Sequence, residues 1–132
     1  MKKIIIDTNF LMIPFKFRVD IFSELNRICD FNYELYIFES SIGELRNIAE
    51  NQSGMDKKAA QFALKLVKLK NIGIIKSGET DVDELMLDSV NNDTIMATQD
   101  IQLKRQLLEK GASLIVLRQK KYLQLTEGKL YK

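Results

Sequence analysis

Four acidic residues stand where strands and helices are expected to meet, and carboxylates placed in this way are suited to binding a divalent cation. Asp7 directly follows the aliphatic run at residues 4–6, which is typical of a strand buried on both faces of a parallel sheet. Such sheets bind their ligands beyond the carboxyl ends of the strands. The other three acids are Glu44, Asp83 and Asp100. Four carboxylates at one edge repel each other unless a cation joins them, and oxygen ligands favour Mg²⁺ or Mn²⁺.

Each of these acids also has a purely structural explanation. Glu44 ends a sequence with the form of a capping box, residues 41–44, and Asp83 ends another at residues 80–83. Asp100 is suited to capping the helix that follows it, and Asp7 is suited to closing a turn. Taken singly, each acid is more often structural. Their common placement at one sheet edge favours a shared site.

The absence of histidine narrows the chemistry that this chain can perform. Without histidine, Ser-His-Asp and Cys-His catalysis are excluded and a zinc site is disfavoured. The single cysteine, Cys29, excludes an internal disulfide framework. No apolar run approaches the roughly 20 residues that span a bilayer, so we expect a cytoplasmic protein with no membrane partner. Proton transfer must then involve carboxylates, lysines, tyrosines or metal-activated water.

Strands alternate with helices along the chain, which predicts an α/β protein. The expected fold is a three-layer α/β/α domain with a central, mainly parallel five-stranded sheet. It covers residues 1–132 as one domain, with a basic tail at residues 118–132 packed on or beside it. Residues 7–17 are predicted as a loop or short helix. The strands are expected at residues 3–6, 34–38, 73–75, 94–98 and 113–117, and the helices at residues 20–29, 41–49, 55–69, 82–90 and 101–110.

The acidic residues and their neighbours resemble the four acidic motifs of PIN-domain ribonucleases. The matching residues are Asp7-Thr8-Asn9, Glu44-Leu45, Asp83 at a helix start, and Ala97-Thr98-Gln99-Asp100. The resemblance covers essentially the whole chain. It is closest to archaeal, VapC-like PIN proteins related to the nucleases that process small-subunit rRNA, and residues 7–15 and 117–123 carry this part of it. The family implies a parallel five-stranded sheet and an Mg²⁺- or Mn²⁺-dependent endoribonuclease that leaves 5′-phosphates.

The resemblance also assigns roles to particular residues. Asp7, Glu44, Asp83 and Asp100 take the metal-binding and catalytic positions, and Thr98 takes the hydroxyl position that lines the site. The segment after Asp83 is short for the family, which leaves Glu84 as an alternative third acid. Adjacent helical positions do not share a face, so at most one of the two points at the ion, and we prefer Asp83.

An RNA substrate requires cations near the acidic edge. The net charge of +2 gives no overall sign of nucleic-acid binding, so the placement of the cations matters more. Aromatic Phe15 and Phe17 lie among them and are suited to stacking on unpaired bases. Lysines in the predicted helix at residues 55–69, such as Lys58, are interpreted as ordinary surface residues. The predicted RNA-binding residues are Lys16, Arg18, Lys104, Arg105, Arg118, Lys120, Lys121 and Tyr122.

The sequence is compatible with three functions. The RNA substrate is expected to be an rRNA precursor or another structured RNA, but a VapC-type toxin with an antitoxin partner fits the same residues. A PIN scaffold that binds RNA or a ribosome precursor without cutting, with an assembly factor as partner, is the third function. A homodimer through the Phe22/Leu25 or Phe62/Leu66 helix faces is a further expectation.

Overall fold

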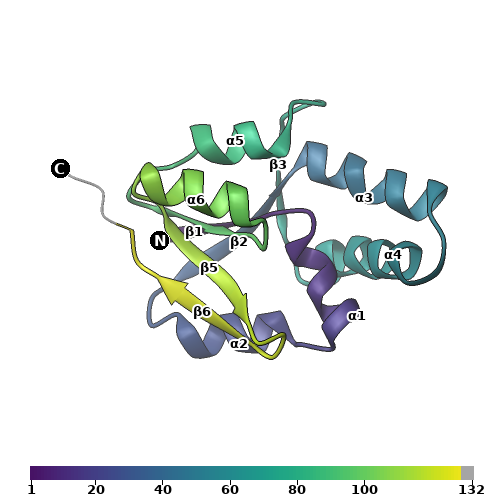
Figure 1. Cartoon of the computed structure of the whole chain (residues 1–132), viewed down its shortest axis with the longest axis horizontal. Helices are drawn as coiled ribbons and strands as arrows, with labels where there is room; N and C mark the ends of the chain where they lie inside the picture. Colours follow the sequence, from purple (N-terminus) through teal and green to yellow (C-terminus); the bar gives the residue numbers. More distant parts are fainter. Residues whose placement is uncertain (129–132) are drawn as a thin grey trace.

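The computed structural model describes residues 1–128, and its centre is a six-stranded sheet with the order β3-β2-β1-β4-β5-β6 (Figure 1). The first five strands along the chain pair in parallel, and β6 runs antiparallel to β5. The mainly parallel sheet is therefore confirmed, and the predicted count of five strands is wrong by one. The strands are β1 (Lys2–Ile6), β2 (Tyr33–Phe38), β3 (Gly73–Ile75), β4 (Thr94–Ala97), β5 (Ser113–Arg118) and β6 (Tyr122–Thr126).

Helices cover both faces of the sheet, as the three-layer prediction requires (Figure 1). Helices α5 and α6 share one hydrophobic core with the sheet, and α1 to α4 share the other. Within residues 1–128 no helix has the length and apolar content needed to cross a membrane. The helices are η1 (Phe10–Met12), α1 (Ile13–Phe17), α2 (Ile21–Ile28), α3 (Glu39–Asn51), α4 (Gly54–Leu69), α5 (Val82–Asp88) and α6 (Ile101–Glu109).

Strand β1 lies at the middle of the sheet and is buried on both faces. Ile4 and Ile6 contribute to the core under α1 to α4, whereas Ile5 contributes to the core under α5 and α6. Side chains alternate along a strand, so an unbroken aliphatic run fills both cores. The N–H of Asp7 donates to the carbonyl of Ala97 at 2.9 Å and continues the pairing of β1 with β4. Asp7 therefore emerges at the centre of the carboxyl edge.

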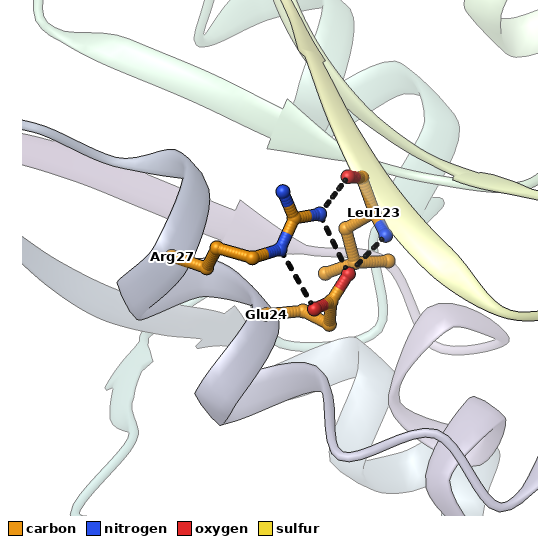
Figure 2. Close-up of polar contacts among 3 residues, drawn as sticks. All are labelled: Glu24, Arg27 and Leu123. Atoms are coloured by element: carbon orange, nitrogen blue, oxygen red, sulfur yellow. Dashed lines mark hydrogen bonds and ion pairs between the residues drawn. The ribbon is translucent and has the colours of Figure 1, made fainter.

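Strand β6, at the edge of the sheet, is held by two side chains of α2 (Figure 2). The N–H of Leu123 donates to Glu24 Oε1 at 2.9 Å, and the carbonyl of Leu123 accepts from Arg27 Nη2 at 3.2 Å. Arg27 also donates from Nε and Nη2 to the two carboxylate oxygens of Glu24, at 2.9 Å each. We call this arrangement the Glu24–Arg27 clamp. It satisfies both backbone polar groups of Leu123, so the segment predicted as a basic tail becomes part of the sheet up to Thr126. Residues 129–132 of that tail lie outside the described residues.

Glu24→Ala is expected to lower the free energy of unfolding by about 1–2 kcal/mol, because Arg27 and the Leu123 N–H lose their acceptor. Hydrogen bonds from Arg27 and Leu123 hold the pKa of Glu24 below its ordinary value. The ionised Glu24 side chain therefore stabilises the fold. This stabilisation is complete above the ordinary Glu pKa and is lost as the pH falls through the lower pKa of the folded state. Urea unfolding at neutral pH and at about pH 3 measures it, since Glu is titrating there.

The exposed Glu50 in α3 provides the matched control, because Glu50→Ala is expected to change little at either pH. The difference between wild type and Glu24→Ala should shrink in acid. An equal difference at both pH values would contradict a role for the Glu24 charge.

Candidate active site

Asp7 is a buried carboxylate at the centre of the carboxyl edge, with only 6% of its surface exposed. Asp7 Oδ1 accepts from the Thr8 N–H at 2.8 Å, and Asp7 Oδ2 accepts from the Thr98 hydroxyl at 2.7 Å. Burial raises the pKa of Asp7, the two hydrogen bonds oppose that rise, and the charges of Glu44 and Asp100 add to it. The net shift is upward, so the described residues only partly compensate the negative charge of Asp7.

Thr98 and Asp100 follow β4 and lie beside Asp7. The Thr98 hydroxyl donates to Asp7 and also accepts from the Asp100 N–H at 3.1 Å. Asp100 Oδ1 accepts from the Leu103 N–H at 3.0 Å and caps α6. The structural explanation of Asp100 is therefore correct, and it coexists with a place beside Asp7, because the charge of Asp100 raises the Asp7 pKa.

Glu44, in α3, also lies near Asp7. The Thr8 hydroxyl donates to Glu44 Oε1, and the charge of Glu44 raises the pKa of Asp7. The alternative that Glu44 belongs to a capping box is wrong, because α3 begins at Glu39, before the start that the capping box implied. Glu44 thus lies in the second turn of the helix and points to the sheet edge.

Asp83 is brought to the site from α5. Asp81 caps this helix by accepting from the Glu84 N–H at 3.2 Å, so Asp83 is not the capping residue. Burial raises the pKa of the half-buried Asp83, and the charges of Asp7, Asp81 and Asp100 raise it further. The side chain of Glu84 is exposed. This geometry supports Asp83 over Glu84 as the third acid.

The sequence analysis missed a set of hydrogen bonds that holds the loop leading to α5. Glu39 Oε1 accepts from the N–H groups of Ser77 and Gly78, at 3.2 and 2.8 Å, and the Ser40 N–H donates to Ser77 Oγ at 2.9 Å. Gly78 has a φ of +59°, which favours glycine. The Ser77-Gly78 turn is visible in the sequence, but its contact with Glu39 joins residues that are 38 and 39 positions apart.

The carboxylates of Asp7, Glu44, Asp83 and Asp100 are suited to a hard divalent cation, although they do not surround one position as a complete set of ligands. Among residues 1–128, no three Asp, Glu or Cys side chains are close enough to form a complete metal site. Mg²⁺ usually keeps several water ligands and needs only one or two carboxylates directly. The donor atoms are oxygens. Burial first, and neighbouring negative charges after it, raise the pKa values of Asp7 and Asp83, and a bound cation would stabilise their ionised forms.

The predicted basic residues fall on two faces of the molecule. Lys104 and Arg105 lie on α6, on the opposite face of the sheet from α1. Lys16 forms an ion pair with Asp56 at 2.7 Å, which partly neutralises it. Lys120 Nζ lies 5.6 Å from the centre of the Phe17 ring, so the β5–β6 turn meets α1. The remaining predicted residues lie at these two segments: Arg18 after α1, and Arg118, Lys121 and Tyr122 in and around the turn.

Thr98→Val is expected to move the acidic limb of the pH–activity profile to higher pH. The Thr98 hydroxyl lowers the pKa of Asp7, so its removal leaves burial and the neighbouring charges to raise that pKa further. Asp7 must be ionised to bind a cation, and activity should therefore be lost at a higher pH than in wild type. Rates measured from about pH 5 to pH 8 test this, because Asp7 titrates above the ordinary Asp range.

Thr98→Ser retains the hydroxyl and is the matched control. Its acidic limb should coincide with that of wild type. A coincident limb in Thr98→Val as well would show that the hydrogen bond does not tune Asp7.

Comparison with known proteins matches this chain to one sequence family. The family described as "PIN like domain" matches residues 4–120. Ribonuclease VapC4 of Methanocaldococcus jannaschii is 32% identical over 127 residues, which cover 95% of this chain and 97% of that protein. Ribonuclease VapC9 of Archaeoglobus fulgidus is 27% identical over 119 residues, covering 89% of this chain and 84% of that protein.

Solved structures match the fold at lower identity. The PIN domain endonuclease Utp24 superposes with a TM-score of 0.77 at 18% identity, covering 95% of this chain and 91% of that one. VapBC-1 from nontypeable Haemophilus influenzae superposes with a TM-score of 0.51 at 13% identity, covering 81% of this chain and 93% of that one. The family match, the full-length relative and the shared fold agree with the acidic motifs. The chain belongs to the PIN-domain family.

Proposed function

We propose that this protein is an endoribonuclease that hydrolyses RNA phosphodiester bonds with the aid of Mg²⁺ or Mn²⁺. The observation that carries the proposal is Asp7, a buried carboxylate with a raised pKa, placed among three further acids at the ligand-binding edge of the sheet. Two sequence relatives bear the name ribonuclease, which supports RNA as the substrate.

Each site residue has a distinct role in this proposal. Asp7 and Asp100 would hold the ion directly, and Glu44 and Asp83 directly or through water. When bound, a divalent ion supplies activation of water and neutralisation of phosphate charge. Thr98 donates to Asp7 and accepts from the Asp100 N–H, so it fixes the two acids relative to each other.

We assign proton acceptance to Asp83, because it is half-buried, whereas Asp7 is buried and already accepts two hydrogen bonds. Burial and three neighbouring charges raise its pKa, and a general base works best when its pKa approaches the working pH. The Glu39–Ser77 and Glu39–Gly78 hydrogen bonds hold the loop before α5 and so help to keep Asp83 in place.

A VapC-type toxin is the second candidate, because both full-length sequence relatives carry the name VapC. In that case an antitoxin would be the protein partner, whereas an RNA-processing enzyme acting on rRNA precursors would associate with assembly factors. Of the helix faces considered for a homodimer, Leu25 and Leu66 are buried within the chain. Phe22 and Phe62 are the residues of those faces that a second copy could contact.

The proposal is tested with end-labelled RNAs, including pre-rRNA fragments and tRNAs, incubated with Mn²⁺, Mg²⁺ or EDTA. Metal-dependent cutting of RNA, with DNA of the same sequence left intact, is the expected result. Cuts confined to pre-rRNA junctions would favour processing, and cutting of a translation RNA that is blocked by an antitoxin would favour the toxin. RNA binding without cutting in any metal would overturn the nuclease proposal in favour of a scaffold.

A further inference from the structure

Three long polar side chains occupy backbone positions that favour glycine. Arg18, Gln119 and Lys120 have φ values of 56°, 52° and 54°. Side chains with a Cβ are strained in this left-handed region, whereas glycine is not. Asn71, at 51°, is the other such residue within 1–128, and asparagine tolerates the region well.

The local structures at these positions are ones in which glycine is the usual residue. Arg18 terminates α1 in the left-handed conformation, which is most often adopted by glycine at a helix end. Gln119 and Lys120 form a two-residue hairpin turn, closed by a hydrogen bond of 3.0 Å from the Lys121 N–H to the Arg118 carbonyl. Such turns favour Asn-Gly or Gly-Gly. Strained positions of this kind concentrate at functional sites.

The two strained segments lie against each other at the carboxyl edge of the sheet. The ammonium of Lys120 lies over the ring of Phe17, the residue before Arg18. The Glu24–Arg27 clamp holds Leu123, in the strand β6 that follows the turn, on α2 (Figure 2). Since the turn follows the carboxyl end of β5, it lies on the same edge as Asp7.

A pocket of about 440 Å³ between α1 and α4 adjoins Arg18. Its apolar lining includes Phe15 and Phe62, whose ring centres are 5.8 Å apart, and the exposed Met55. Arg18 and Lys58 are its exposed cations. An aromatic lining with cations around it is the chemistry that unpaired nucleotides require, because bases stack and phosphates need positive charge.

We propose that Arg18, Lys120 and this pocket form one surface that binds an unpaired segment of the RNA substrate. Arg18 and Lys120 contact phosphates, and a base enters the pocket against Phe15 and Phe62. The inference rests on the proposed ribonuclease function and specifies where on the protein the RNA strand is held. Lys58, interpreted from the sequence as an ordinary surface lysine, belongs to this surface.

Replacement by glycine separates a binding role from a structural one, because glycine removes the cation and also relieves the backbone strain. Arg18→Gly and Lys120→Gly are made in the Asp7→Asn protein, which permits binding to be measured without cleavage. Anisotropy of labelled single strands of about 12 nucleotides gives the affinity at several salt concentrations. Each variant should bind roughly fivefold more weakly, and the slope of log affinity against log salt should fall by about 0.7.

The melting temperature completes the test. Neither glycine variant should melt below the Asp7→Asn parent, since strain relief offsets lost contacts. Asn71→Gly is the matched control, at the same kind of backbone position but outside the surface, and its affinity should not change. Phe62→Leu, which keeps an apolar side chain but removes the ring, should weaken binding of single strands and leave duplex binding unchanged.

Unchanged affinity and salt slope in both glycine variants would overturn the inference. Equal binding of duplex and single strand would also overturn it. If wild-type protein cleaves RNA with metal while the variants bind normally, only this inference fails. If wild-type protein neither cleaves nor binds RNA, the proposed function fails with it.

Discussion

Asp7→Asn is expected to abolish metal-dependent cleavage and, in the same protein, to raise thermal stability in EDTA. The rate should fall at least about a thousandfold, because the substitution removes the central carboxylate of the site. Stability should rise because burial raises the pKa of Asp7. Protonated Asp7 brings no buried charge into the fold. The stability that goes with this uncharged form is fully present below the ordinary Asp pKa and is lost as the pH rises through the raised pKa of the folded state. At neutral pH the wild-type fold therefore carries an unfavourable buried charge that asparagine lacks.

Melting curves of wild type and Asp7→Asn at neutral pH, in EDTA and in Mn²⁺, measure the predicted change in stability. A gain of about 1 kcal/mol corresponds to a rise of about 3–5 °C in EDTA for a chain of this size. Mn²⁺ should raise the melting temperature of wild type and leave that of Asp7→Asn unchanged, because a ligand stabilises only the fold that binds it. Asp93→Asn, in an exposed loop, is the control and should match wild type in both buffers. An Asp7→Asn protein that melts earlier in EDTA would refute the argument.

Asp83→Asn is expected to lower kcat by about a hundredfold, whereas Glu84→Gln changes it less than about twofold. The two residues are adjacent on α5, but only Asp83 is half-buried near the charges of Asp7 and Asp100. The capping bond to Asp81 uses the backbone N–H of Glu84 and survives either change. Single-turnover cleavage in saturating Mn²⁺, with melting temperatures as a control for folding, compares them. A larger loss in Glu84→Gln would assign the third acidic position to Glu84.

The layered fold and the acidic edge were predictable because they depend on local patterns. The aliphatic run before Asp7 is typical of a strand buried on both faces, and this interpretation placed Asp7 at the carboxyl edge, as the structure confirms. The junctions between expected strands and helices singled out Glu44, Asp83 and Asp100, the family resemblance assigned their roles, and the structure brings them near Asp7. Helical geometry allowed only one of Asp83 and Glu84 to face the site, and the burial of Asp83 beside an exposed Glu84 supports the choice of Asp83.

The features that escaped prediction depend on contacts between distant residues. Strand β6 was missed because its turn, Gln119-Lys120, lacks the asparagine or glycine that marks a hairpin, and its support from Glu24 and Arg27 comes from about a hundred residues earlier. The capping-box alternative for Glu44 failed because α3 starts earlier than its local signal indicates. The separation of Lys104 and Arg105 from the other cations follows from which face each helix covers, which periodicity does not specify.

The Glu24–Arg27 clamp also limits how another protein can bind at this side of the sheet. A partner that added a strand beside β6 would need the N–H and carbonyl of Leu123, and both are already bonded within the chain. An antitoxin or assembly factor that paired a strand along the middle of β6 would first have to displace Glu24 and Arg27 from Leu123. Backbone pairing at this point of the edge therefore competes with two side chains of the protein itself.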